Sequence, residues 1–160
     1  PTLVGASTGL VAGLVAITPG AGFVEPWAAL IIGAAVPPVC FFAISHLKAR
    51  FGYDDALDAF GCHGIGGIVG GVLTGLFCVP ELSWTDFGGL FYTGDPTMLI
   101  AQVLGIAVTI AIVLILDLVL VLVVKALCGG SLRVDEADEA LGLDISEHGE
   151  SAYPAFTGLD

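Results

Sequence analysis

A long apolar run at residues 97–127 limits what this chain can fold into more than any other feature. It contains only two charged side chains, Asp117 and Lys125. A helix needs about 20 apolar residues to cross the hydrocarbon core of a bilayer, which is roughly 30 Å thick. The run exceeds that length, so we expect a membrane-spanning helix that tilts or extends beyond the bilayer.

Three further apolar runs have the composition of membrane spans. They cover about residues 2–18, 27–47 and 55–79. Hydrophobic residues make up 56% of the chain and charged residues only 12%, whereas about a quarter of the residues in a soluble domain are charged. We therefore predict an all-α fold, a polytopic membrane helix bundle, with its transmembrane domain at residues 1–128.

Residues 129–160 differ from the spans because they are rich in acidic side chains, and we expect a separate, water-facing tail there. The acidic residues are Asp135, Glu136, Asp138, Glu139, Asp144, Glu147, Glu150 and Asp160. The chain starts at Pro1 inside an apolar segment and lacks the charged region of a signal peptide. We expect it to be the C-terminal part of a longer polypeptide.

The positive charges predict the orientation in the membrane. The basic residues are Lys48, Arg50, Lys125 and Arg133. With four spans, the loop between the second and third spans lies on the same side as the C-terminus, and all the basic residues fall on that side. Loops rich in Lys and Arg lie in the cytoplasm. We therefore expect a multi-pass protein of the plasma or inner membrane with a cytoplasmic C-terminus.

A histidine, His63, lies inside the third span. Ionisable side chains within spans are costly, and they usually face a bundle interior or a water-filled path. Helical spacing puts Ala59, Phe60 and His63 on adjoining parts of one face. Two interpretations stay open: His63 lines a transport path, or it hydrogen-bonds to a neighbouring span as part of the packing.

Three aspartates, Asp54, Asp55 and Asp58, precede or open the helix of His63. Carboxylates at a helix start accept free N–H groups and complement the helix dipole, and we favour this role for Asp54. Asp58 lies about one turn before His63. Asp55 and Asp58 either hold the backbone or a neighbouring helix, or they make the site attractive to a cation.

Glycines recur every four residues in the first and third spans, which favours close packing of helices. They are Gly5, Gly9, Gly13, Gly67, Gly71 and Gly75. The four cysteines lie far apart and show no ligand spacing with histidines, so we expect packing residues and neither a metal site nor a disulfide framework. No nucleophile–base pair or phosphate loop appears, and we expect neither a cofactor nor enzymatic activity.

Three motifs resemble the ammonium transporters of the Amt/Mep/Rh family, and the Amt branch most of all. The run DDALDAFGCHGIGGIVGGVLTGLF is similar to the segment around the second pore histidine of that family. It is preceded by GLVAITPGAGFVEPWAALIIG and followed by LRVDEADEALGLDISEHGESAY, which resembles the cytoplasmic tail of Amt proteins. The motifs occur in the family's order and extend over nearly the whole chain.

The resemblance implies an eleven-span protein with two inverted repeats, assembled as a homotrimer with one pore per subunit. This chain would hold the last four spans and would lack the first pore histidine. His63 would be the second pore histidine, and Thr18 and Thr8 would be polar positions on a span beside the pore. The implied function is transport of ammonium or ammonia through a hydrophobic pore lined by histidine.

The resemblance also implies a regulatory tail that packs onto a neighbouring subunit, on a face that receives a PII signalling protein in many prokaryotes. The tail residues concerned are Arg133, Gly142, Asp144, Ser146, His148, Gly149 and Tyr153. Ser146 lies where plant relatives carry a regulatory phosphothreonine. Ser131 replaces the family's usual glycine, so we expect a locally different exit from the last helix. Composition alone favours a disordered acidic tail.

Two other functions stay open on the sequence alone. A membrane ammonium sensor or regulatory module would keep the same pore residues and the same tail. An inactive fragment would keep them as well, because half a pore does not transport unaided. In each case the expected surroundings are the lipid membrane, and no nucleic acid is expected as a partner.

Overall fold

The computed structural model describes residues 2–150, and within that range it contains helices and loops but no strand. Four helical segments are long and apolar enough to cross a membrane by length and composition: Leu3–Gly20, Pro26–Phe51, Phe60–Phe77 and Thr97–Leu127. Their mean hydropathy lies between 1.5 and 3.2. The chain divides into two compact units, residues 1–111 and residues 112–160.

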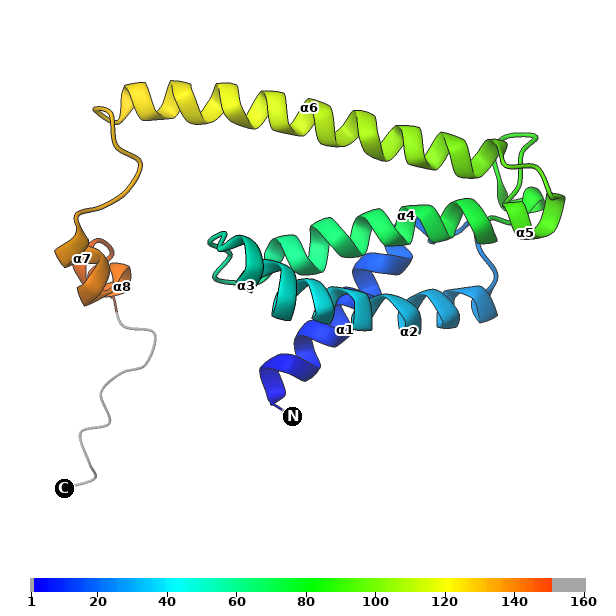
Figure 1. Cartoon of the computed structure of the whole chain (residues 1–160), viewed down its shortest axis with the longest axis horizontal. Coiled ribbons are helices and arrows are strands. Elements are labelled where there is room, and N and C mark those ends of the chain that lie inside the picture. The colour runs from blue at the N-terminus through cyan, green and yellow to red at the C-terminus, as the bar shows by residue number, and fades with distance from the viewer. Residues whose placement is uncertain (1, 151–160) are drawn as a thin grey trace. The chain divides into compact units, whose positions relative to one another are not determined.

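The first unit is built from three packed helical segments and the start of a fourth (Figure 1). The first segment is α1 (Leu3–Ile17), which ends in a 3₁₀ turn. The second is α2 (Pro26–Phe42), continued by the π turn η2 (Ala43–Leu47) and by α3 (Lys48–Phe51). The third is the π turn η3 (Phe60–Ile65) followed by α4 (Gly66–Phe77).

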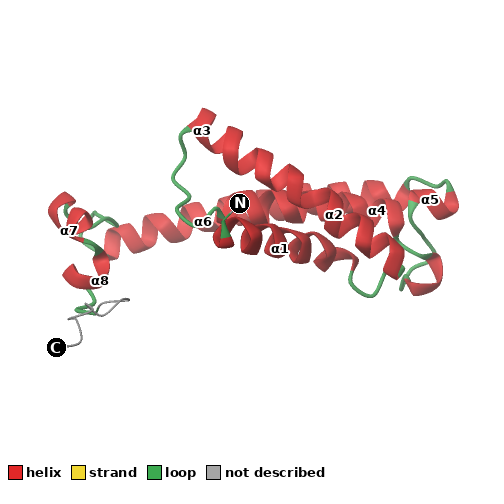
Figure 2. Ribbon diagram, turned by 90° about the horizontal axis from the view of Figure 1, so that it is seen from below, coloured by secondary structure: helices red, strands yellow, loops and turns green. Residues whose placement is uncertain are grey.

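A loop and the last long helix follow. A 3₁₀ turn at Pro80–Leu82 and the short α5 (Leu90–Thr93) occupy the loop. The helix α6 (Thr97–Leu127) then follows as one element with residues in both units. Figure 2, coloured by secondary structure, shows helices joined by loops throughout the described residues.

Apolar side chains form the core between α1, α2 and α4. Ala12 and Ala16 of α1 are buried, and α2 contributes a buried residue at every fourth position: Ala28, Ile32, Val36 and Cys40. A Cβ atom added at Gly70 of α4 would lie 2.2 Å from the carbonyl oxygen of Ala16. The two backbones therefore approach as closely as glycine allows.

The glycine spacing predicts this close packing only in part. Gly71 and Gly75 of α4 face α6, where an added Cβ at Gly75 would lie 2.8 Å from the Cα of Leu99. Gly67 has open space around it, and the contact with α1 falls to Gly66 and Gly70 instead. Within the described residues, Gly67 therefore makes no close helix contact, and the close contacts lie on two adjacent faces of α4.

The third helical segment begins later than the predicted residue 55. Helical structure starts at Ala59 and Phe60, because Asp58 has a left-handed backbone with φ of 54° that interrupts any helix before it. The second segment extends beyond the predicted residue 47 to Phe51 and ends at Gly52, where φ is 64°.

The tail forms two short helices, α7 (Glu136–Leu141) and α8 (Leu143–Ser146), on either side of Gly142. After the end of α6, Gly129 and Gly130 have positive φ. They directly precede Ser131, the position where the family usually has glycine. The Ser131 hydroxyl donates to the carbonyl oxygen of Arg133 at 2.8 Å and accepts from its N–H at 3.1 Å. Serine is accommodated here because the two preceding glycines make the turn.

Candidate functional site

His63 lies in the π turn η3, and its side chain is exposed in this chain. A π turn inserts an extra residue into a helix, and such turns are frequent at functional sites. The imidazole borders a hollow of about 510 Å³. The lining residues are Leu3, Val4, Ser7, Thr8 and Val11 of α1, with Leu57, Ala59, Cys62 and His63.

The structure brings three of the predicted pore residues to this hollow, and two others lie elsewhere. Thr8, Ala59 and His63 line it together. Phe60 is 54% exposed and packs edge-on against Tyr53, with ring centroids 5.7 Å apart. The Thr18 hydroxyl donates to the carbonyl oxygen of Leu14 at 2.8 Å, at the far end of α1.

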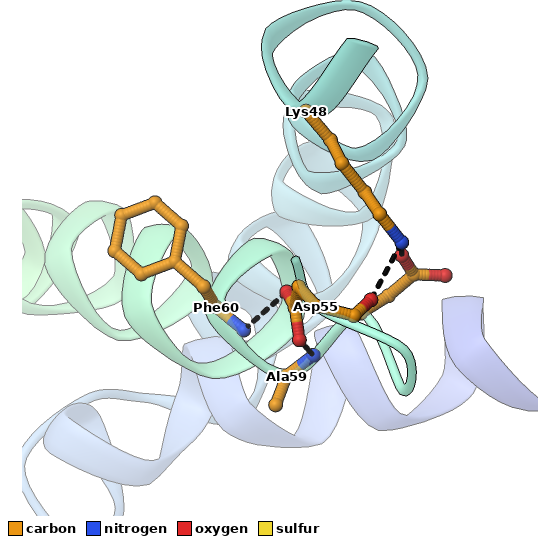
Figure 3. A network of polar contacts seen from close by, with 5 residues as sticks. Lys48, Asp55, Ala59 and Phe60 are labelled. Atoms are coloured by element: carbon orange, nitrogen blue, oxygen red, sulfur yellow. Dashed lines mark hydrogen bonds and ion pairs between the residues drawn. The ribbon is translucent and has the colours of Figure 1, made fainter. Parts of the chain in front are cut away.

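The helix that carries His63 is capped by Asp55 (Figure 3). One carboxylate oxygen of Asp55 accepts from the N–H of Ala59 at 2.8 Å, and the other accepts from the N–H of Phe60 at 2.9 Å. This is the capping role that the sequence favoured for Asp54. It falls to Asp55 instead, because the helix begins at Ala59 and its free N–H groups point to that carboxylate.

Asp58 is paired with a lysine of the preceding helical segment. The Lys48 Nζ atom lies 2.8 Å from an Asp58 carboxylate oxygen and donates to the carbonyl oxygen of Asp55 at 2.5 Å. Both charged side chains are about a third exposed. The ion pair has no net formal charge as a unit, and it joins α3 to the start of η3.

The tail residues form a local network in the second unit. The Arg133 guanidinium donates to both carboxylate oxygens of Glu139, at 2.7 and 2.5 Å. These hydrogen bonds lower the pKa of the Glu139 carboxyl. The Ser146 hydroxyl is within hydrogen-bond distance of the carbonyl oxygens of Asp138 and Gly142, at 3.2 and 3.1 Å.

Of the remaining predicted tail residues, Asp144 lies in α8, whereas Gly142, His148 and Gly149 lie outside the helices. Gly142 and Gly149 have φ of 98° and 64°. The carbonyl oxygen of Asp144 accepts from the N–H of Glu150, and the N–H of His148 donates to Leu143. Tyr153 lies outside the described residues.

Two features of the site were not predicted. The sequence shows Lys48 only as a positive charge and Cys40 only as a packing residue, yet both contact the segment that carries His63. Their spacing, with Ile44 between them, places them on one face of a helix and could have indicated a shared partner. Within residues 2–150, no group of three or more His, Cys, Asp or Glu side chains could hold a metal ion.

Comparison with known proteins decides the family. The profile of the Ammonium Transporter Family matches residues 1–153. The chain belongs to the ammonium transporter family. An ammonium transporter of Bacillus subtilis is 50% identical over 153 residues, which are 96% of this chain and 37% of that protein. One of Aquifex aeolicus is 51% identical over 153 residues, 96% of this chain and 35% of that protein.

The fold agrees with this family. The crystal structure of Saccharomyces cerevisiae Mep2 superposes with a TM-score of 0.78 at 34% identity, over 99% of this chain and 36% of Mep2. The prediction of an all-α membrane helix bundle that forms part of an ammonium transporter fold is therefore confirmed. The chain spans little more than a third of the length of these relatives. The relatives are named as transporters, not as enzymes.

Proposed function

We propose that this chain forms part of a path for ammonium or ammonia across the plasma or inner membrane, with His63 as its polar group. The observation that carries the proposal is the exposed His63 imidazole beside a mostly apolar hollow, on a membrane helix of an ammonium transporter. Thr8 and Ala59 share that hollow. Thr18 and Phe60 belong to the proposed path only through the resemblance.

The chemistry of such a path favours an imidazole. Moving a bare cation into hydrocarbon costs on the order of tens of kcal/mol, so the ion must be re-solvated or lose its proton. A neutral imidazole offers one donor and one acceptor. Imidazoles also gain and lose protons near neutral pH. His63 is thus suited to orient ammonia and to accept or relay a proton, while apolar walls disfavour hydrated potassium.

The proposal extends to assembly and control. We infer a homotrimer with the C-terminus in the cytoplasm, a tail that docks on a neighbouring subunit, and a PII signalling protein as a partner of that face. The local network of Arg133, Glu139 and Ser146 supports an ordered tail rather than a disordered one. A phosphate on Ser146 would lie against two carbonyl oxygens and favour release of the tail.

The decisive substitution is His63→Ala in the full-length product of the gene, expressed in a microbial strain without ammonium transporters of its own. We expect ammonium-dependent growth and methylammonium uptake to be lost, or potassium to be admitted, at unchanged membrane abundance. His46→Ala is the matched control, because His46 stacks on Phe42 with ring centroids 4.7 Å apart and does not line the hollow. Unchanged uptake and unchanged potassium exclusion in His63→Ala would refute the proposal.

A further inference from the structure

Three side chains of the second helical segment touch the start of the segment that carries His63. They are Cys40, Ile44 and Lys48, and their spacing of four residues puts them on one face. The Cys40 thiol donates to the carbonyl oxygen of Cys62 at 3.9 Å. Lys48 donates to an Asp58 carboxylate oxygen and to the carbonyl oxygen of Asp55, the contact that Figure 3 shows from close by.

The middle contact is steric. Gly61 lies against Ile44, and a Cβ atom added at Gly61 would be 2.4 Å from the Cγ1 atom of Ile44. The Cγ1 atom is bonded directly to the branched Cβ of isoleucine, and χ1 of a β-branched side chain is stiff. Cγ1 therefore moves little, and only glycine fits at residue 61. Ile44 belongs to the π turn η2 and Gly61 to the π turn η3, so the two irregular turns pack directly on each other.

Each of these contacts adjoins a part of η3 whose backbone geometry determines where His63 points. Asp58 sets the start of the segment through its left-handed backbone, and its carbonyl oxygen accepts from the N–H of Cys62 at 2.9 Å. Gly61 and Cys62 directly precede His63. A shift of either residue would move the backbone of His63 and so turn the imidazole.

We propose that Cys40, Ile44 and Lys48 form a positioning stripe that fixes the π turn η3 and aims the His63 imidazole into its hollow. The proposal rests on the proposed function, since it assigns these residues to the same path. They are positioning residues, because they act through η3 and do not line the hollow beside His63. Pairing with Lys48 also offsets the cost of the left-handed backbone at Asp58.

The first test replaces Lys48 by Met, which keeps the length of the side chain and removes its charge. In the full-length gene product we expect the ratio of ammonium to potassium transport to fall by about tenfold to a hundredfold, as for misplacement of a group by roughly 1 Å. Arg50→Met is the matched control, because it removes the same positive charge from an exposed residue two positions further along the same helix. Lys48→Arg should restore much of the ratio.

The second test uses a compensating pair. Gly61→Ala should lower the same ratio, because its Cβ collides with Ile44. Ile44→Ala in the same protein removes the colliding atom and should recover transport. All rates are divided by membrane abundance, so that a loss of folded protein is not counted as a loss of positioning. If Lys48→Met does not accumulate in the membrane, the comparison of Gly61→Ala with the double variant Gly61→Ala, Ile44→Ala tests the positioning stripe by itself.

Two outcomes would overturn the positioning stripe. One is normal rate and selectivity in both Lys48→Met and Gly61→Ala while His63→Ala abolishes transport. The other is a defect in Gly61→Ala that Ile44→Ala does not relieve. Failure of the proposed function itself would look different, because His63→Ala would then transport as well as the unsubstituted protein.

Discussion

At the scale of single residues, the unusual backbone of Asp58 has the widest effect. It is the one residue other than glycine with positive φ among those described, at 54°. Aspartate and asparagine adopt this region more readily than other side chains, and glycine most readily of all. Asp58 therefore combines two properties, a tolerated left-handed turn and a charge for Lys48.

Substitutions at Asp58 separate these two properties. Asp58→Asn tolerates the left-handed backbone and keeps a polar side chain but loses the charge. Asp58→Gly tolerates the backbone and loses the whole side chain. Asp58→Ala loses the charge and also disfavours the backbone. We expect Asp58→Ala to be the least stable, by about 1–2 kcal/mol relative to Asp58→Gly, because a left-handed backbone costs that much for alanine. Thermal unfolding of the purified full-length product measures the order. Equal stability of the glycine and alanine variants would contradict it.

At the scale of elements, α1 and α4 pack backbone against backbone, which is possible because Gly70 has no side chain at the contact. Gly70 meets the backbone of Ala16, and Ala16 itself is fully buried. Without a hydrophobic drive between helices in lipid, such close contact is a main source of helix association.

Gly70→Ala tests this contact. The added Cβ would lie 2.2 Å from the Ala16 carbonyl oxygen, so the helices must separate. We expect a loss of about 1–3 kcal/mol in unfolding free energy, typical of overpacking. Gly67→Ala serves as the control, because among residues 2–150 no atom beyond its own helix backbone and chain neighbours lies within 4 Å of its added Cβ. Thermal denaturation in detergent distinguishes the two, and equal melting temperatures would argue against the tight contact.

The tail helices respond to acid through Glu139. Its pKa is lowered by the hydrogen bonds from Arg133, so protonation weakens the folded arrangement. The stabilisation is fully present above the ordinary glutamate pKa of 4.5 and is lost as the pH falls through the lower folded value. We expect the Arg133 Nε–H signal in NMR spectra to lose its exchange protection in acid. Glu139→Gln should remove this pH dependence, and protection that persists unchanged in acid would contradict the pairing.

Apolar periodicity and length were enough to predict the helical segments, but not how the third one starts. Hydrophobic composition extends back to residue 55, whereas the helix begins at Ala59 because Asp55 caps it and Lys48 pairs with Asp58. The contacts of Lys48 with Asp55 and Asp58 join positions seven and ten residues apart in the chain, so local propensity does not encode them. Likewise, the sequence singles out His63 as an ionisable residue in an apolar run, whereas the π turn that carries it has no signature in the pattern.

At the scale of the whole molecule, apolar and ionisable residues of the membrane helices are exposed in this chain. None of the hydrophobic window of α6 is buried within this chain, and His63 is exposed. Asp117 lies exposed in the middle of α6, where a carboxylate facing lipid would be costly. Together with the length of the relatives, this predicts that further membrane segments or subunits cover these faces.

The 160-residue chain alone is expected to form no complete path. Reconstituted into lipid vesicles, it should give no ammonium flux above that of protein-free vesicles. The B. subtilis relative, reconstituted in the same way, provides the positive control. Flux equal to that of the relative would contradict the view that the chain supplies only one wall of the path.

The two π turns make the second and third helical segments intolerant of changes in length. Deleting one residue between Ala43 and Leu47 would convert η2 toward a regular helix and rotate Lys48 by roughly 100° about the axis. Deleting one residue within η3 would rotate His63 relative to everything after it in the same way. Homologous chains that keep this site should therefore conserve the spacing between residues 40 and 63, even where the side chains that make none of these contacts vary.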